Sequence, residues 1–229
     1  MPDSKRTASI GDIPQTLVGG GPVTTAILEI ALRYAPRLIA VDSGADAILS
    51  EGKVPDRVVG DLDSISDRAL EAFADVLCLI SEQDSTDFAK ALRTCPSPLT
   101  IAVGFIGARA DHFLSVLTEM ARTRAPVVLL GEEECICVLP PDLTLDLVAG
   151  TRVSLWPLGP ASGVSSGLRW PIDGIDFDPA TRTGTSNEAT GAVTLTMRGD
   201  MVLLLPAAEL PKLLSAMQSP PRGAGVVEV

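Results

Sequence analysis

Between Gln15 and Gly131 the sequence alternates short apolar runs with amphipathic segments, and this alternation constrains the fold more than any other feature. The apolar runs are each about five residues long and rich in Val, Ile and Leu, which is typical of strands buried on both faces of a sheet. They occupy residues 16–20, 37–42, 57–61, 76–80, 99–104 and 126–131. The intervening segments predict helices over 22–34, 44–51, 66–73, 85–93 and 111–123, with Ser66 and Ser85 as N-caps. This order of elements predicts an α/β fold with a mostly parallel sheet and flanking helices.

The pattern changes after residue 138, where β-type runs are separated by Gly, Pro, Ser and Asp turns. These runs occupy residues 143–148, 151–158, 191–199 and 201–206, and the next predicted helix lies at about 208–217. The change predicts a second, smaller domain that is mostly β and of ordinary size for a domain. We therefore expect an α/β domain over 14–137, a β domain over 138–217 and a mobile tail over 218–229.

The composition excludes several classes of partner. The 229 residues include 29 acidic and 18 basic side chains, and the resulting net charge of −11 disfavours binding to nucleic acid or to anionic membranes. Most of this charge, −8, falls within residues 40–90, which hold nine Asp and three Glu but two Lys and two Arg. A hydrophobic content of 46% and a charged content of 21% are typical of an ordinary globular protein.

The sequence also predicts the cellular location. No apolar run reaches the roughly 18 residues of a membrane span, and the first residues lack the apolar stretch of a signal peptide. The four cysteines form no CxxC pair, which favours reduced thiols. We therefore expect a soluble, cytoplasmic protein.

The single histidine, His112, limits the possible chemistry. It excludes a zinc site with two or more His ligands from one chain. It also leaves only one imidazole around which a hydrolytic triad could be built.

Polar residues and a glycine run follow the predicted strands at their carboxyl ends, which is where ligands bind in open α/β sheets. These residues are Gly19, Gly20, Gly21, Asp42, Asp61, Asp63, Asp84, Asp87, Arg109, Asp111 and His112. Carboxylate oxygens are hard ligands that suit Mg²⁺, an ion that often bridges protein carboxylates and phosphates. Asp61 and Asp63 lie two residues apart, so they share a face if the strand alternation continues. We therefore predict a magnesium site of Asp61, Asp63 and Asp87; the alternative is that each caps a helix or begins a turn.

Several neighbouring residues allow two interpretations each. The glycine run either presents N–H groups to a phosphate or forms a tight turn, and it lacks the GK[ST] ending of a P-loop. Lys90 either pairs with Asp87, one helical turn away, or reaches a phosphate. Arg109 offers a planar fork to a phosphate or a carboxylate. His112 is either a hydrogen-bonding group or base, or a structural cap contact.

Two features of the second domain are also ambiguous. Trp156 and Trp170 are the only tryptophans, and the default expectation for each is packing in the core. The segment GTSNE (184–188) is either a plain polar turn or a set of hydrogen-bonding groups for a ligand.

Six segments together resemble the thiamine pyrophosphokinase family. They are VDSGAD (41–46), PDRVVGDLDSI (55–65), DSTDFAKAL (84–92), GARADHFL (107–114), LRWPI (168–172) and GTSNE (184–188). A GDxDS element followed by DxTDxxKAL and GxRxDH elements is a specific combination, and the resemblance extends over about residues 16–206. Ala108 and Ala110 depart from the family pattern, but neither departure removes a functional group.

The resemblance implies an α/β catalytic domain followed by a β-sandwich domain that binds thiamine. It implies transfer of the diphosphoryl group of ATP to the hydroxyl of thiamine, which yields thiamine diphosphate and AMP. It further implies that Asp61, Asp63 and Asp87 coordinate Mg²⁺, with Asp42 close enough to join through water.

The resemblance assigns the phosphates and the thiamine hydroxyl to further residues of the α/β domain. Lys90 and Arg109 would meet the phosphates, with Thr86 in support. Asp111 and His112 would hold or deprotonate the hydroxyl side of thiamine.

The resemblance also implies that the protein is a homodimer with its active site at the subunit interface. Trp170 would stack on the thiamine pyrimidine from the neighbouring subunit. Ser186 and Asn187 would make polar contacts with thiamine.

Two other functions remain as alternatives. A phosphatase of the haloacid dehalogenase type would use Asp61 as nucleophile and Asp63 as acid or base, but that pair normally follows the first strand rather than the third. A non-catalytic regulator that binds thiamine or a nucleotide would not require the complete set of aspartates.

Overall fold

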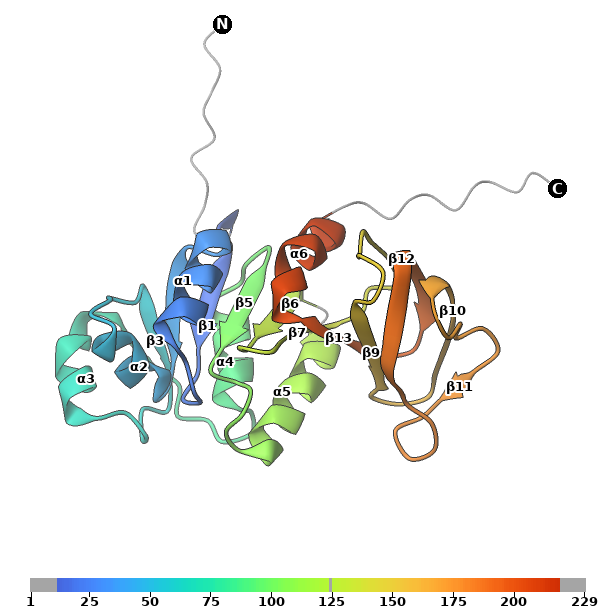
Figure 1. The fold of residues 1–229 in the computed structure, drawn as a ribbon. Helices are drawn as coiled ribbons and strands as arrows, with labels where there is room; N and C mark the ends of the chain where they lie inside the picture. Colours follow the sequence, from blue (N-terminus) through green and yellow to red (C-terminus); the bar gives the residue numbers. More distant parts are fainter. Residues whose placement is uncertain (1–11, 124, 219–229) are drawn as a thin grey trace, which may run out of the picture. The chain divides into compact units, whose positions relative to one another are not determined.

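The computed structural model describes residues 12–123 and 125–218, which divide into two compact units between Glu132 and Glu133 (Figure 1). The strands of the first unit are β1 (Gln15–Val18), β2 (Arg37–Val41), β3 (Arg57–Gly60), β4 (Leu77–Leu79), β5 (Thr100–Val103) and β6 (Val127–Leu130). Its α-helices are α1 (Thr25–Tyr34), α2 (Gly44–Ser50), α3 (Asp67–Ala72), α4 (Asp87–Thr94) and α5 (Ala110–Thr123), and a short 3₁₀ helix, η2 (Ala74–Val76), precedes β4. Each strand and helix predicted for this region has a counterpart, so the predicted α/β fold is confirmed.

The sheet of the first unit is parallel throughout, in the order β6-β5-β1-β2-β3-β4. The chain runs from β1 to β2, β3 and β4 on one side of β1 and then returns to β5 on its other side. All residues of β1, β5 and β6 are buried, as expected for strands covered on both faces. The strand order therefore reverses between β1 and β5, and ligands bind outside the carboxyl ends of the strands at such a point.

Side-chain caps set where the helices after β3 and β4 begin. Ser66 caps α3 as predicted, by accepting a hydrogen bond from the backbone N–H three residues later. The predicted cap of α4 was wrong, because Thr86 rather than Ser85 accepts the N–H of Ala89. Ser85 lies one residue too early to reach that group, and its hydroxyl instead contacts Glu82.

The second unit consists of antiparallel strands followed by one helix. The strands are β7 (Glu134–Val138), β8 (Asp142–Leu145), β9 (Arg152–Pro157), β10 (Ala161–Leu168), β11 (Asp176–Phe177), β12 (Gly184–Arg198) and β13 (Met201–Pro206). They lie in the order β11-β10-β12-β9-β13-β7, and β8 also pairs with β12. A 3₁₀ helix, η3 (Ala207–Glu209), leads into α6 (Leu210–Gln218).

The long strand β12 has different partners along its length. Residues Gly184–Glu188 pair with β9, whereas Val193–Thr196 pair with β8. In its second half the buried residues Val193, Leu195 and Met197 alternate with exposed ones, so one face of this half packs into the core.

The two units divide at a different place from the predicted boundary at 137/138. Most of strand β7 falls within the predicted range of the first domain, but it pairs antiparallel with β13, from Glu134 opposite Pro206 to Val138 opposite Val202. A short apolar run such as β7 fits either domain by its own pattern, and its partner lies far along the chain. The predicted tail begins at Gln218, the last residue of α6, and the rest of it lies outside the described residues.

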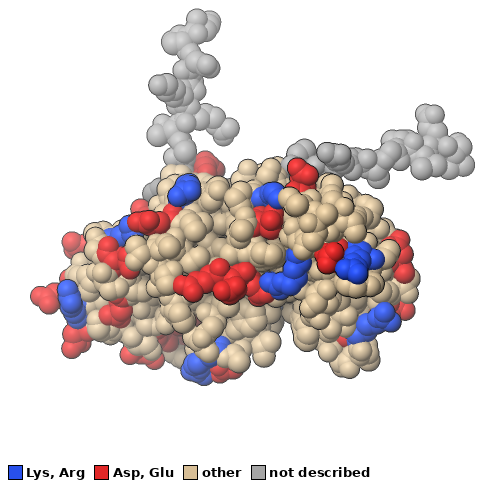
Figure 2. All heavy atoms as spheres, viewed as in Figure 1, with Lys and Arg blue, Asp and Glu red and all other residues tan. Residues whose placement is uncertain are grey.

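The surface reflects the acidic composition. Figure 2 shows acidic side chains in red on both units, with a dense acidic band in the middle of the face that it views.

Within residues 12–123 and 125–218, every helix is too short or too polar to cross a membrane.

Candidate active site

A cavity of about 400 Å³ lies at the carboxyl ends of β1, β2 and β5, where the strand order of the first unit reverses. The predicted site residues that line it are Gly19, Gly20, Gly21, Asp42, Thr86, Asp87, Arg109 and His112. Ser43, Ser64 and Phe105 also line it, and none of them was predicted from the sequence. The cavity therefore brings together loops that follow several different strands, as the convergence of carboxyl ends predicted.

The glycine run is required by close packing of two loops. The N–H groups of Gly19 and Gly21 donate to the carbonyl oxygens of Val103 and Gly104, each at 2.8 Å. A Cβ atom on Gly21 would lie 2.6 Å from the carbonyl oxygen of Gly104, which is too close for any side chain. The run is thus a tightly packed turn, and the same turn forms one wall of the cavity.

Three aspartates form a cluster beside the cavity. Asp42, Asp61 and Asp63 each offer a carboxylate oxygen, and these oxygens all lie within 4.8 Å of one another. Oδ1 of Asp42 is buried and has no hydrogen-bond partner among the described residues. Burial raises the pKa of Asp42, and a backbone hydrogen bond from Ser43 lowers it. The negative charges of Asp87, Asp61 and Asp63 add to the effect of burial, so the pKa is raised overall. A buried, unpartnered oxygen among like charges fits a hard cation as its missing partner.

Asp61 and Asp63 converge for a different reason from the predicted strand alternation. Strand β3 ends at Gly60, and Leu62 has a φ of 63°, in the left-handed region. The chain therefore turns between the two aspartates instead of continuing as a strand. The N–H of Asp63 donates to Oδ1 of Asp61 at 3.5 Å, which closes this turn.

Lys90 is a buried cation that joins two of the aspartates. Its side chain is only 2% exposed, and Nζ lies 2.9 Å from Oδ1 of Asp87 and 3.7 Å from Oδ2 of Asp61. Burial lowers the pKa of Lys90, but the hydrogen bond to Asp87 and the nearby acidic charges outweigh it and raise the pKa overall. Of the two interpretations of Lys90, the structure shows the pairing with Asp87.

Gln83 contacts the aspartate cluster, although the sequence did not mark it as a candidate residue. Its Nε2 donates to Oδ2 of Asp61 at 3.3 Å. Burial raises the pKa of Asp61, but the N–H of Asp63, the Gln83 amide and the Lys90 charge outweigh it and lower the pKa overall. Gln83 immediately precedes the DSTD segment, and this position was the one signal available in the sequence.

Arg109 and Asp111 form a two-pronged ion pair at the start of α5. Nε and Nη2 of Arg109 lie 3.1 Å and 2.6 Å from the two carboxylate oxygens of Asp111. The hydrogen bonds from Arg109 lower the pKa of Asp111 to about 2. Both side chains are well exposed, so the guanidinium can exchange this partner for another anion. His112 lies in the first turn of α5 and lines the cavity.

The second-unit candidates form a separate group around Trp170. This tryptophan is 54% exposed, so the expectation that it packs in the core was wrong. The side-chain amide of Asn187 accepts from the N–H of Trp170 at 3.2 Å and donates to its carbonyl oxygen at 2.7 Å. The guanidinium of Arg169 lies 4.9 Å from the centre of the Trp170 ring. Ser186 has a φ of 63°, and its N–H donates to Oγ of Ser154.

Known proteins resemble this chain in both sequence and fold. A model of the family described as "Thiamin pyrophosphokinase, catalytic domain" matches residues 28–129. Thiamine pyrophosphokinase 3 of Oryza sativa subsp. japonica is 27% identical over 218 residues, which cover 74% of this chain and 81% of the relative. Thiamine pyrophosphokinase of Bacillus subtilis (strain 168) is 34% identical over 113 residues, which cover 45% of this chain and 53% of the relative.

The fold agrees with these sequence matches. A crystal structure of yeast thiamin pyrophosphokinase matches with a TM-score of 0.74 at 16% identity, covering 87% of this chain and 88% of that chain. At that identity the likeness shows the fold alone. The family match over residues 28–129 includes the aspartate cluster, Lys90, Arg109 and His112. Residues 28–129 therefore match the catalytic domain of the thiamine pyrophosphokinase family, and the chain is similar to members of that family in sequence and fold.

Proposed function

We propose that this protein transfers the diphosphoryl group of ATP to the hydroxyl of thiamine, which gives thiamine diphosphate and AMP. The observation that carries this proposal is the aspartate cluster with its buried, unpartnered Asp42 oxygen, beside the cavity of a thiamine pyrophosphokinase fold. In the reaction the thiamine oxygen attacks the β-phosphorus of ATP, and the bond from that phosphorus to the oxygen of AMP breaks. Such transfers depend mainly on positioning and on neutralising charge.

Asp61, Asp63 and Asp87 would hold Mg²⁺, with Asp42 close enough to join through water. The proximity of the oxygens of Asp42, Asp61 and Asp63 supports these three residues, and Asp87 lines the same cavity as Asp42 although it lies outside the three-residue cluster. Bound Mg²⁺ offsets the negative charge of the ATP phosphates and of the leaving AMP. Lys90 keeps Asp87 and Asp61 in place and partly neutralises them before substrate binds.

The remaining residues of the first unit would bind ATP and orient the thiamine hydroxyl. Thr86 and Arg109 line the cavity and would contact the phosphates. Lys90 would supply positive charge from its buried position next to Asp87 and Asp61. A phosphate would replace Asp111 as the partner of Arg109, since both are anions that fit the guanidinium fork. The thiamine hydroxyl must lose its proton as it attacks, and we assign Asp111 and His112 to hold or remove that proton.

We further propose that residues 138–217, which lie within the second unit, form a β-sandwich that binds thiamine. The change of partners along β12, from β9 to β8, supports a sandwich. The exposed ring of Trp170, held in place by Asn187, supports stacking on the thiamine pyrimidine, and Ser186 would add a polar contact. An exposed ring suits a site completed by a second subunit, so we propose a homodimer.

The four unpaired cysteines support a cytoplasmic location.

The first test is incubation of the purified protein with ATP, Mg²⁺ and thiamine, with the products identified by mass. We expect AMP and thiamine diphosphate in equal amounts. Release of ADP with thiamine monophosphate, or no turnover that depends on thiamine, would contradict the proposal.

The phosphatase alternative has no support. Its aspartate pair would normally follow the first strand, but Asp61 follows β3, and the residue after β1 is Gly19.

Trp170→Ala is expected to raise the KM for thiamine by about tenfold, because loss of aromatic stacking costs on the order of 1.4 kcal/mol. The turnover number and the KM for ATP should change little. The measurement is steady-state kinetics with thiamine varied at saturating ATP. Trp156→Ala is the control, since Trp156 is also partly exposed but has no proposed contact with substrate. An unchanged KM for thiamine in Trp170→Ala would remove Trp170 from the site.

A further inference from the structure

The loop between β4 and α4 is tied together by the side chain of Glu82. Oε2 of Glu82 accepts hydrogen bonds from the backbone N–H groups of Asp84, at 2.8 Å, and Ser85, at 3.0 Å. Its other oxygen, Oε1, accepts a hydrogen bond from the Ser85 hydroxyl. Hydrogen bonds from Ser85 and Arg93 lower the pKa of Glu82 to about 2, so the carboxylate is ionised at neutral pH. One side chain therefore satisfies two consecutive backbone donors of this loop.

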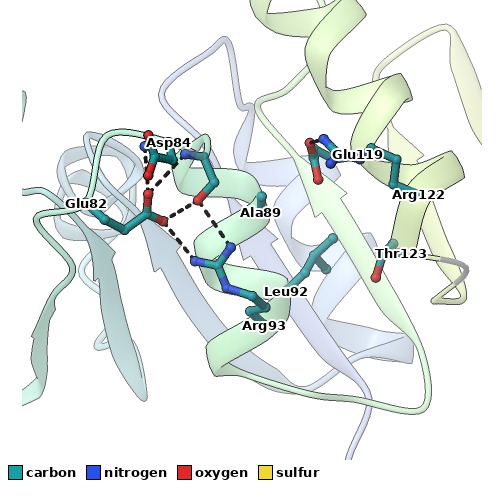
Figure 3. A pocket seen from close by; sticks show the side chains of 9 residues that line it. Glu82, Asp84, Ala89, Leu92, Arg93, Glu119, Arg122 and Thr123 are labelled. Carbon is teal, nitrogen blue, oxygen red and sulfur yellow. Dashed lines mark hydrogen bonds and ion pairs between the residues drawn. The ribbon is translucent and has the colours of Figure 1, made fainter.

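Arg93, two turns along α4, holds Glu82 from the other side. Nη2 of Arg93 lies 2.9 Å from Oε1 of Glu82, and Nη1 donates to Oγ of Ser85 at 3.2 Å. Figure 3 shows this group on one wall of a groove of about 610 Å³, lined by residues of α4 and α5. The opposite wall carries a second ion pair, Arg122 with Glu119 at 3.1 Å, which lies wholly on α5.

The same loop carries residues of the aspartate site. Gln83 follows Glu82 directly and contacts Asp61, while Thr86 and Asp87 end the loop and line the cavity. Two neighbouring residues of the loop thus make contacts in different places. Glu82 binds Arg93 at the groove, and Gln83 binds Asp61 at the aspartate cluster. Without Glu82, the backbone N–H groups of Asp84 and Ser85, which lie between Gln83 and Asp87, would lose their acceptor.

We infer that Glu82 and Arg93 are a positioning pair, which keeps Gln83 and Asp87 in the geometry that the diphosphoryl transfer needs. The expected effect on kcat/KM rests on the proposed function, whereas the expected effect on amide exchange does not. Neither residue lines the cavity beside the aspartate cluster, so we assign both a role through the loop. An exposed ion pair by itself contributes little to stability, but this one closes a network that includes two backbone N–H groups.

Glu82→Ala is expected to lower kcat/KM for MgATP by about tenfold, because small displacements of positioning groups have effects of this size or larger. The KM for thiamine should stay unchanged, since the groups proposed to contact thiamine, in the second unit and at Asp111 and His112, lie outside the loop between β4 and α4. Amide exchange at Asp84 and Ser85, measured by NMR, should become faster in the same variant. Arg93→Ala should have a smaller effect of the same kind, and the double variant should be no worse than Glu82→Ala alone.

Glu119→Ala is the matched control, because it removes an ion pair from the other wall of the same groove without touching the loop. It should leave kcat/KM and both amide exchange rates at the wild-type values. Wild-type kcat/KM in Glu82→Ala, or independent additive effects of Glu82→Ala and Arg93→Ala, would overturn the positioning pair. If the wild-type protein forms no thiamine diphosphate, the proposed function fails. The amide exchange rates then decide alone whether Glu82 and Arg93 hold the loop.

Discussion

Asp61→Asn is expected to lower kcat by roughly tenfold or more without unfolding the protein, because the lost carboxylate would help to hold the Mg²⁺ that offsets charge on the phosphates in the transition state. Asp61 lies at the centre of the site: it belongs to the aspartate cluster, accepts from Gln83 and lies 3.7 Å from the ammonium of Lys90. The Asn side chain preserves the size of the residue while removing one of the three charges that would hold Mg²⁺. The amide also places a donor beside the Gln83 amide, which already donates there, and beside the Lys90 ammonium, so we expect binding of the cation to weaken as well.

Two measurements test the Asp61 prediction. Steady-state kinetics with Mg²⁺ varied should show a lower kcat and a higher half-saturating Mg²⁺ concentration. Titration of the nucleotide-free protein with Mn²⁺, followed by electron paramagnetic resonance, should show weaker binding independently of turnover. Glu71→Gln is the matched control, because it removes one negative charge from an exposed position on α3. Near-normal kcat together with unchanged Mn²⁺ binding would remove Asp61 from the metal site.

Gly44→Ala is expected to destabilise the protein by about 3 kcal/mol, at the upper end of the usual cost of overpacking. Gly44 is the first residue of α2, and a Cβ atom there would lie 1.9 Å from the carbonyl oxygen of Val18 and 2.6 Å from its carbon. Val18 ends β1, a buried central strand, so its backbone cannot move aside cheaply. The same displacement would disturb Asp42, two residues before Gly44.

Urea unfolding followed by far-UV circular dichroism measures this effect as a lower midpoint at an unchanged slope. Gly159→Ala is the control, since nothing lies within 4 Å of the Cβ atom that it would add. Helix propensity by itself predicts the opposite result, because Ala is favoured over Gly in helices by about 1 kcal/mol. A Gly44→Ala protein as stable as the wild type, or more stable, would show that β1 yields to the new side chain.

The local elements could be predicted from the sequence because their signals are local. Burial on both faces produces short runs of Val, Ile and Leu, and these runs correspond to β1–β6. Ser66 was correctly predicted as a cap, whereas the cap of α4 was misplaced by one residue. Ser85 and Thr86 are adjacent hydroxyl residues of similar capping ability, and the choice between them depends on the contacts of Ser85 with Glu82 and Arg93.

The location of the site could also be predicted, but not its internal contacts. Parallel strands bring their carboxyl ends to one edge of the sheet. This rule was enough to predict that the loops with Asp42 and Asp87 meet, and both residues line one cavity. The rule gives no information on side-chain direction. It did not predict that Leu62 turns the chain between Asp61 and Asp63, or that Gln83 contacts Asp61.

For this protein, the order of elements, the α/β fold and the family resemblance follow from residues close together in the sequence. Three features depend on the tertiary structure: the buried pairing of Lys90 with Asp87 and Asp61, the pairing of β7 with β13, and the exposure of Trp170. The physical reason is the range of the interactions. Strand and helix patterns reflect neighbours within a few positions, whereas burial, charge pairing and strand register depend on groups that only the folded chain brings together.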